Sequence, residues 1–325
     1  MNRRKAITTG AALLGLPLLS FAEQRVKRIG FLVSAGRPTK TDESYYDRFR
    51  DELRRQGRVD GRDLVIEWRF AENRPERLAA LAGELVKIRC DVIVTRGPPA
   101  NRAAKQATST IPIVVAVSGD PVGEGLIKNL ARPEGNVTGF WTGGGEYLGK
   151  HLELLAGVQP RISRIAIVHN PLALSHPSQL KIVHALAEAT GIRLQVYDAR
   201  SADEIESRFI SMTQARAEGL MILGDALFSQ NNPLLGNLAL KHRLASVYTL
   251  DHADAGGLFS YGPDLAAMFQ LAAGYVDKIL RGAKPGELPF QQPGRFELIV
   301  NLKTAQQLGL TISQRILLSA DRIIR

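Results

Sequence analysis

The stretch Asp91–Pro121, DVIVTRGPPANRAAKQATSTIPIVVAVSGDP, predicts a strand, a turn, a helix and a second strand. Residues 92–94 are an apolar β-branched run, typical of a strand buried on both faces. Gly97-Pro98-Pro99 ends this run, an Ala-rich helix follows over residues 100–108, and residues 113–117 form the second strand. Two parallel strands joined by one helix place both carboxyl ends at the same sheet edge, where open α/β sheets bind ligands.

The turns after these two strands are the first candidate site. We expect residues 95–98 and 118–120 to line one wall of a cleft. The free N–H groups at the start of the helix, near Ala100, favour an anionic ligand group. An equally good interpretation is that both segments are ordinary strand-to-helix turns, and this stretch alone leaves the two open.

The first 22 residues have the composition of an export signal. Arg3-Arg4-Lys5 is basic, residues 6–19 are mostly apolar, and Ser20-Phe21-Ala22 provides small residues for signal peptidase. We expect cleavage near Ala22 and a periplasmic location, with export by the general or the twin-arginine route. A lipid-anchored protein would need a cysteine at the cut, and none stands there.

The charge pattern and the single cysteine argue against a nucleic-acid-binding protein and against a fold held by an internal disulfide. The formal net charge is +10, of which three charges belong to the basic leader. Over residues 47–63 the arginines alternate with acidic residues, which is typical of a solvated helix face rather than of a nucleic-acid site. Cys90 is the single cysteine, so no internal disulfide is expected, and we interpret it as a small core residue.

The chain repeats one β-α-β-α-β pattern. RIGFL at 28–32 returns as RIAIV at 164–168, and DVIVT at 91–95 returns as GLMIL at 219–223. The sequence therefore predicts an α/β fold of two doubly wound, Rossmann-like lobes with a central ligand cleft.

Several stretches together carry a family resemblance: DVIVTRGPPANRAAKQATSTIPIVV, GDPVGEGLIKNLARPEGNVTGF, GKHLELL, SYGPDL, YVDKILRGAKPGELP and FELIVNLKTAQQLGLTI. The chain resembles the exported solute-binding proteins of ATP-binding-cassette (ABC) importers with the periplasmic binding protein type I fold. Within these it is similar to the branch related to tryptophan- and tyrosine-type binders. The resemblance covers nearly the whole chain after the leader.

This resemblance implies three crossovers between the lobes, closure on a small-molecule ligand and delivery to an ABC permease in the inner membrane. It implies a monomer, no nucleic-acid partner and no cofactor. It divides the chain into a signal peptide (1–22), lobe 1 (26–140 plus 258–290) and lobe 2 (141–257 plus 291–325). Its ligand-binding positions fall on Ser34, Thr95, Gly97, Pro98, Ser118, Asp120, Pro121, Trp141, Thr142, Asn170, Asp225, Ser260 and Tyr261. Arg96 and His169 depart from the family pattern, which has a small or apolar residue and an aromatic residue there.

The residue types at these positions suit an amino acid or a small aromatic acid. Asp120 and Asp225 end equivalent strands of the two lobes, and either could bind an ammonium group. Trp141 or Tyr261 could stack on an apolar moiety. The alternatives are that each aspartate caps its own turn, that Trp141 packs between the lobes, and that Arg96 is solvated rather than a clamp for an acidic ligand.

Rival functions find less support. Residues 144–150 have phosphate-loop spacing, but His151 stands where Ser or Thr should bind magnesium. The six histidines show no metal-site spacing, and no nucleophile elbow or dinucleotide fingerprint is present. An export signal precedes the first strand where a regulator would carry a helix-turn-helix. We therefore expect a binding protein and not an enzyme; the alternatives are a periplasmic ligand sensor for a signalling receptor and an enzyme on the same scaffold.

Overall fold

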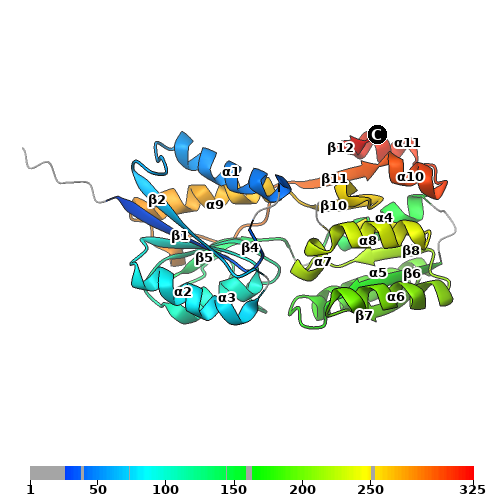
Figure 1. Cartoon of the computed structure of the whole chain (residues 1–325), viewed down its shortest axis with the longest axis horizontal. Helices are drawn as coiled ribbons and strands as arrows, with labels where there is room; N and C mark the ends of the chain where they lie inside the picture. Colours follow the sequence, from blue (N-terminus) through cyan, green and yellow to red (C-terminus); the bar gives the residue numbers. More distant parts are fainter. Residues whose placement is uncertain (1–25, 38–39, 73, 144, 159–162, 250–252) are drawn as a thin grey trace, which may run out of the picture.

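The computed structural model describes residues 26–325, except residues 38–39, 73, 144, 159–162 and 250–252. The predicted signal peptide lies outside the described residues. The chain builds two α/β lobes side by side along the long axis of the molecule (Figure 1). We call the lobe around the five-stranded sheet lobe 1 and the lobe around the seven-stranded sheet lobe 2. Among the helices that the structure describes, none is long and apolar enough to cross a membrane.

Lobe 1 is a parallel sheet in the order β2-β1-β3-β4-β5 between two helical layers. α1 and α9 cover one face, and α2 and α3 cover the other (Figure 1). Val92 and Val94 pack in the core under α1 and α9, whereas Ile93 packs in the core under α2 and α3. This alternation confirms a strand buried on both faces. The elements are β1 (Lys27–Val33), α1 (Lys40–Arg55), β2 (Leu64–Phe70), η1 (Pro75–Arg77), α2 (Leu78–Lys87), β3 (Val92–Arg96), α3 (Pro98–Ala107), β4 (Ile113–Ser118), β5 (Val137–Trp141), α9 (Leu265–Leu280) and η3 (Pro285–Glu287).

Lobe 2 repeats the doubly wound arrangement and extends it. Its sheet runs β12-β11-β10-β9-β8-β6-β7 and is parallel except where β11 lies antiparallel to β10. The elements are α4 (Leu148–Val158), β6 (Arg164–His169), α5 (His176–Thr190), β7 (Arg193–Asp198), α6 (Ala202–Gln214), β8 (Gly219–Ile222), α7 (Ala226–Gln230), α8 (Asn232–Lys241), β9 (Ala245–Tyr248), η2 (Ala253–Ala255), β10 (Phe259–Pro263), β11 (Phe296–Asn301), α10 (Leu302–Leu308), α11 (Gln314–Ser319) and β12 (Arg322–Ile324).

Within the described ranges the chain passes between the lobes at three places: after β5, after β10 and before β11. The predicted change of lobe between residues 257 and 258 is wrong, because β10 pairs with β9 and β11 in lobe 2. Its sequence FSYGP contains Gly and Pro, which are rare in strands, and the two flanking strands override that preference. At the last crossing Gln291, predicted in lobe 2, still pairs with β5 of lobe 1 through the Trp141 N–H (3.0 Å).

Lobe 1 is closed by contacts between α1 and α9, which are far apart in the sequence. Glu52 is 6% exposed, and its carboxylate accepts hydrogen bonds from Arg55, Gln56 and Gln270. Nearby, Arg58 donates to Asp277 at 2.5 Å. These polar contacts lie beside the apolar core that the two helices share with the sheet.

Candidate functional site

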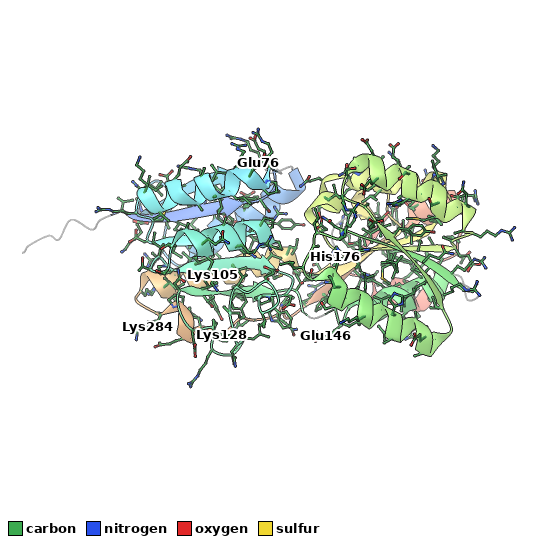
Figure 2. All side chains as sticks on the ribbon, turned by 90° about the horizontal axis from the view of Figure 1, so that it is seen from below. Glu76, Lys105, Lys128, Glu146, His176 and Lys284 are labelled. Atoms are coloured by element: carbon green, nitrogen blue, oxygen red, sulfur yellow. The ribbon has the colours of Figure 1, made fainter. Side chains whose placement is uncertain are left out.

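The carboxyl ends of the central strands of the two lobes face each other. The turn after β4 in lobe 1 approaches the start of α5 in lobe 2: a Cβ atom placed on Gly119 would lie 3.2 Å from Ser175 Oγ. Figure 2 shows His176, the first residue of α5, at the end of lobe 2 that faces lobe 1. The space between these edges is therefore bordered by strand ends from both lobes, the arrangement in which open α/β sheets bind ligands.

The turn after β3 is tightly built. Gly97 has φ +96°, and a Cβ there would lie 2.3 Å from Ser34 Oγ, so only glycine fits. Ser34 Oγ donates to the carbonyl oxygen of Arg96 (3.2 Å) and ties the end of β1 to this turn. Ser34, Gly97 and Pro98 are half-buried at the edge of lobe 1.

The expected anion site at the start of α3 is weaker than the sequence suggested. The helix begins at Pro98 rather than at Ala100, so both Pro98 and Pro99 occupy its first turn. Proline has no N–H, and two of the four donors that a helix start normally leaves free are therefore missing. Ala100, which could supply a donor, is fully buried.

Thr95 and Ser118 do not line the interlobe space, because both are fully buried. Thr95 Oγ1 donates to Asn101 Oδ1 (2.7 Å), and Ser118 Oγ donates to Glu124 Oε1 (2.9 Å). Asn101 Nδ2 lies 3.5 Å from Glu124 Oε2 and closes a buried polar network. Both hydroxyl groups thus support the turns from behind.

Asp120 behaves as a turn cap, the alternative weighed from the sequence. Its Oδ1 accepts the N–H of Gly123 (2.8 Å), and its carbonyl oxygen accepts the N–H of Glu124. Asp120 is nevertheless half-exposed. Pro121 is buried in the same turn, where its carbonyl oxygen accepts the N–H of Leu126.

Asn170 and Asp225 meet at the edge of lobe 2. Asp225 Oδ1 accepts the N–H of Leu227, as the N-cap of α7, and also accepts Asn170 Nδ2 (3.1 Å). Behind them, His176 is fully buried; with its proton on Nε2 it donates to the Gly224 carbonyl oxygen, and Nδ1 accepts the Asn170 N–H. Burial lowers the pKa of His176, which favours this neutral form.

The four remaining predicted residues lie at or near the crossings. Trp141 is half-buried and packs on the core under α2 and α3, and Thr142 donates its N–H to the Ser118 carbonyl oxygen (2.9 Å). Ser260 is 3% exposed within β10. Tyr261 stacks on Phe296 (5.9 Å between ring centroids) inside lobe 2. Trp141 and Thr142 thus adjoin the turn after β4, whereas Ser260 and Tyr261 are part of the lobe 2 sheet.

Arg96, one of the departures from the family pattern, is half-buried and held by side chains of lobe 1. Its guanidinium donates to the Tyr46 hydroxyl (2.9 Å) and lies 5.7–5.8 Å from the ring centroids of Tyr45, Tyr46 and Phe269. These cation–π contacts hold the side chain against lobe 1. His169, the other departure, lies with its ring 6.1 Å from that of His176, and burial lowers its pKa.

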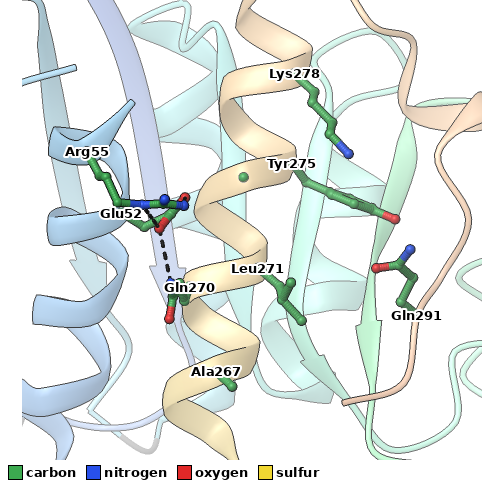
Figure 3. Close-up of a pocket in the computed structure, with 9 residues that line it drawn as sticks. Glu52, Arg55, Ala267, Gln270, Leu271, Tyr275, Lys278 and Gln291 are labelled. Atoms are coloured by element: carbon green, nitrogen blue, oxygen red, sulfur yellow. Dashed lines mark hydrogen bonds and ion pairs between the residues drawn. The ribbon is translucent and has the colours of Figure 1, made fainter. Parts of the chain in front are cut away.

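A hollow of the described surface lies elsewhere, on lobe 1. It has a volume of about 370 Å³ and runs along α9, between Glu52 and Arg55 on one side and Tyr275, Lys278 and Gln291 on the other (Figure 3). The carboxylate of Glu52 is already bonded to protein donors, which leaves little for a ligand to satisfy. The described residues also contain no cluster of three His, Cys, Asp or Glu side chains suited to a metal ion.

Four residues that shape the two edges were not predicted from the sequence: Asn101, Glu124, Ser175 and His176. Asn101 is the single polar side chain that α3 buries, and Glu124 stands between Gly123 and Gly125 in a largely apolar segment. A polar residue in an apolar setting was the available signal for both. Ser175 and His176 precede Pro177, a residue common at helix starts, which marks the beginning of α5.

Several known proteins resemble this chain over most of its length. The tyrosine-binding protein of Clostridioides difficile (strain R20291) is 26% identical over 274 residues, 83% of this chain and 76% of that protein. The structure of the ABC domain from Streptococcus pneumonia in complex with L-Trp superposes with a TM-score of 0.85 at 24% identity, covering 92% of this chain and all of that one. The ligand-free, open structure of a Clostridium difficile substrate binding protein gives a TM-score of 0.71 at 22% identity, with 92% and 99% covered.

These likenesses confirm the two-lobed periplasmic binding protein type I fold. Residues 40–324 match the family described as ABC transporter substrate binding protein. Because the match spans most of the chain, the protein belongs to the ABC transporter substrate binding protein family.

Proposed function

We propose that this substrate-binding protein captures an amino acid, or a small aromatic or carboxylic acid, between its lobes and delivers it to an ABC permease. The observation that carries the proposal is the approach of the turn after β4, at Gly119, to the start of α5, at Ser175. A ligand between these edges would contact both lobes, and such contacts favour the closed state. The tyrosine-binding relative and the L-Trp complex support an amino acid as the ligand.

The ligand's ammonium group is assigned to Asp225. Its carboxylate stands at the facing edge of lobe 2, where Asn170 and the Leu227 N–H fix its orientation. Asp120 supplies a second negative charge from lobe 1. Ser34, Gly97, Pro98, Trp141 and Thr142 form the lobe 1 side of the site.

Transport places further requirements on the protein. We assign it to the periplasm, exported with cleavage near Ala22, and acting as a monomer without nucleic acid. A periplasmic sensor that presents its ligand to a receptor would use the same cleft. Deletion of the permease genes separates these two roles, because uptake of labelled ligand is lost only if the protein serves import.

A thermal-shift titration of the purified protein tests ligand capture. The panel is L-tyrosine, L-tryptophan, a short dicarboxylate, a sugar and a nucleotide. A ligand at about 100 times its dissociation constant adds about 2.7 kcal/mol to the folded state. At this chain length that corresponds to a rise in melting temperature on the order of 5 °C. A rise with nucleotides alone would favour an enzyme, and no rise with the two amino acids or the dicarboxylate contradicts the proposed ligand class.

Asp225→Asn locates the site with little structural cost. Asparagine caps helices as well as aspartate and can retain both bonds to Oδ1, so only the charge is removed. We expect an unchanged melting temperature without ligand and at least tenfold weaker amino-acid binding. Asp203→Asn, which changes an exposed carboxylate of α6 in the same lobe, is the matched control. Equal affinity in both variants would exclude Asp225 as the ammonium partner.

A further inference from the structure

Glu124 is a buried carboxylate behind the lobe 1 edge. It is 6% exposed and lies in the turn that follows β4. Its Oε1 accepts three hydrogen bonds from consecutive residues: Ser118 Oγ (2.9 Å), Gly119 N (3.3 Å) and Asp120 N (3.3 Å). One oxygen atom therefore fixes both the side chain that ends β4 and the next two peptide N–H groups.

The same carboxylate connects this turn to the neighbouring strand. Asn101 Nδ2 lies 3.5 Å from Glu124 Oε2 and 3.4 Å from the Val117 carbonyl oxygen. Asn101 Oδ1 accepts the hydroxyl of Thr95 at the end of β3. The network thus links the carboxyl ends of β3 and β4 through the first turn of α3.

A buried carboxylate is a costly way to satisfy three donors. Transfer of a charge out of water is unfavourable, and burial accordingly raises the pKa of Glu124, although its donors act in the opposite direction. An acceptor is needed at this place, because the N–H groups of Gly119 and Asp120 would otherwise lose their partner. What the carboxylate adds is a single defined shape for Ser118-Gly119-Asp120.

That shape matters because of where the turn lies. Gly119 faces Ser175 of lobe 2 closely enough that a Cβ atom placed on it would lie 3.2 Å from Ser175 Oγ. We propose that Glu124 is a positioning residue for ligand capture, which holds the Ser118–Asp120 turn in its binding conformation from behind. This inference rests on the proposed function, since it assigns this turn to the wall of the ligand site.

Holding the turn in one conformation strengthens ligand binding, because it increases the fraction of molecules whose site is in the binding conformation. If the binding conformation of a site is occupied only a tenth of the time, the apparent dissociation constant rises tenfold. Glu124→Leu keeps the size of the side chain but removes the shared acceptor, which leaves three donors to find other partners. Glu124→Gln keeps a neutral acceptor in the position of Oε1, and neutral hydrogen bonds are weaker than those to a carboxylate.

The first arm of the test uses hydrogen exchange without ligand. We expect the amides of Gly119 and Asp120 to exchange at least tenfold faster in Glu124→Leu than in the natural protein, with Glu124→Gln in between and the β4 amides unchanged. Glu76→Leu, at an exposed position of η1 labelled in Figure 2, is the control and should change neither amide. Unchanged exchange at Gly119 and Asp120 would overturn the inference, whatever the ligand is.

The second arm measures binding of L-tyrosine and L-tryptophan by calorimetry, well below the melting temperature of each variant. We expect Glu124→Leu to bind at least tenfold more weakly and Glu124→Gln to recover part of that loss. A purely structural residue would lower the melting temperature and leave the affinity of the folded fraction unchanged; that result would also overturn the inference. Absence of binding by the natural protein contradicts an aromatic amino acid as the ligand, while the exchange arm still decides the role of Glu124.

Discussion

Substitution of Glu52 by glutamine should weaken lobe 1 at neutral pH and have no effect in strong acid. Glu52 is the buried carboxylate between α1 and α9 that accepts hydrogen bonds from Arg55 and Gln270 (Figure 3). It also accepts one from Gln56. The guanidinium of Arg55, followed by the two amides, lowers the pKa of Glu52 from 4.5 to about 2. Glutamine retains the shape but loses the charge.

The expected size follows from this pKa shift. One pKa unit corresponds to about 1.4 kcal/mol, so the shift corresponds to about 3 kcal/mol. Arg55 is 73% exposed, and solvent screening of that partner reduces the expected loss to about 1–3 kcal/mol. Because the pKa is lower in the folded state, the stabilisation is complete above pH 4.5 and disappears as the pH falls to about 2.

Urea unfolding followed by tryptophan fluorescence measures this loss of stability in lobe 1. The chain has two tryptophans, Trp68 in β2 and Trp141 in β5, and both lie in the lobe 1 sheet. The control is Asp51→Asn, which breaks the exposed pair with Arg54 on the same helix and should cost less than about 0.5 kcal/mol. A Glu52→Gln cost equal to that of the control, or equal at pH 6 and pH 2.5, would refute the reasoning.

Two further predictions concern lobe 2. Gly262→Ala should lower the stability of lobe 2 by more than about 4 kcal/mol, because the new Cβ would lie 1.5 Å from the Thr249 carbonyl oxygen. The control is Gly149→Ala, whose new Cβ meets only ordinary contacts and which should be neutral. Circular-dichroism melts measure both variants. His151 is fully buried and burial lowers its pKa from 6.5 to about 4, so the folded state binds fewer protons and acid should destabilise it by about 3 kcal/mol between pH 6.5 and 4. Melting curves of His151→Gln should lose this pH dependence, and a constant difference from the natural protein across that range would contradict it.

The sequence predicted the layers well because each buried strand is a local apolar run. The alternation of Val92, Ile93 and Val94 between two cores is visible in the order of the letters. β10 was missed for the opposite reason. Its five residues include Gly262 and Pro263, and only the pairing with β9 and β11, which no local pattern encodes, makes it a strand.

The sequence predicted where the site residues lie better than it predicted what their side chains contact. Asp225 and Asn170 do stand together at the edge of lobe 2. Thr95 and Ser118 were expected to face a ligand but point into the protein, because the direction of a side chain at a strand end depends on where the strand stops. Their partners Asn101 and Glu124 come from separate turns, and such a network arises only when the fold brings them together.

The pairing of α1 with α9 sets an order of events during synthesis. Arg58 is bonded to Asp277, which lies 219 residues later in the chain. At a translation rate of about 5–20 residues per second, Asp277 is synthesised roughly 10–40 seconds after Arg58. The sheet of lobe 2 likewise includes two strands that are synthesised late, β11 and β12. Lobe 1 therefore cannot be completed before α9 has been made, and the sheet of lobe 2 cannot be completed before β11 and β12 have been made.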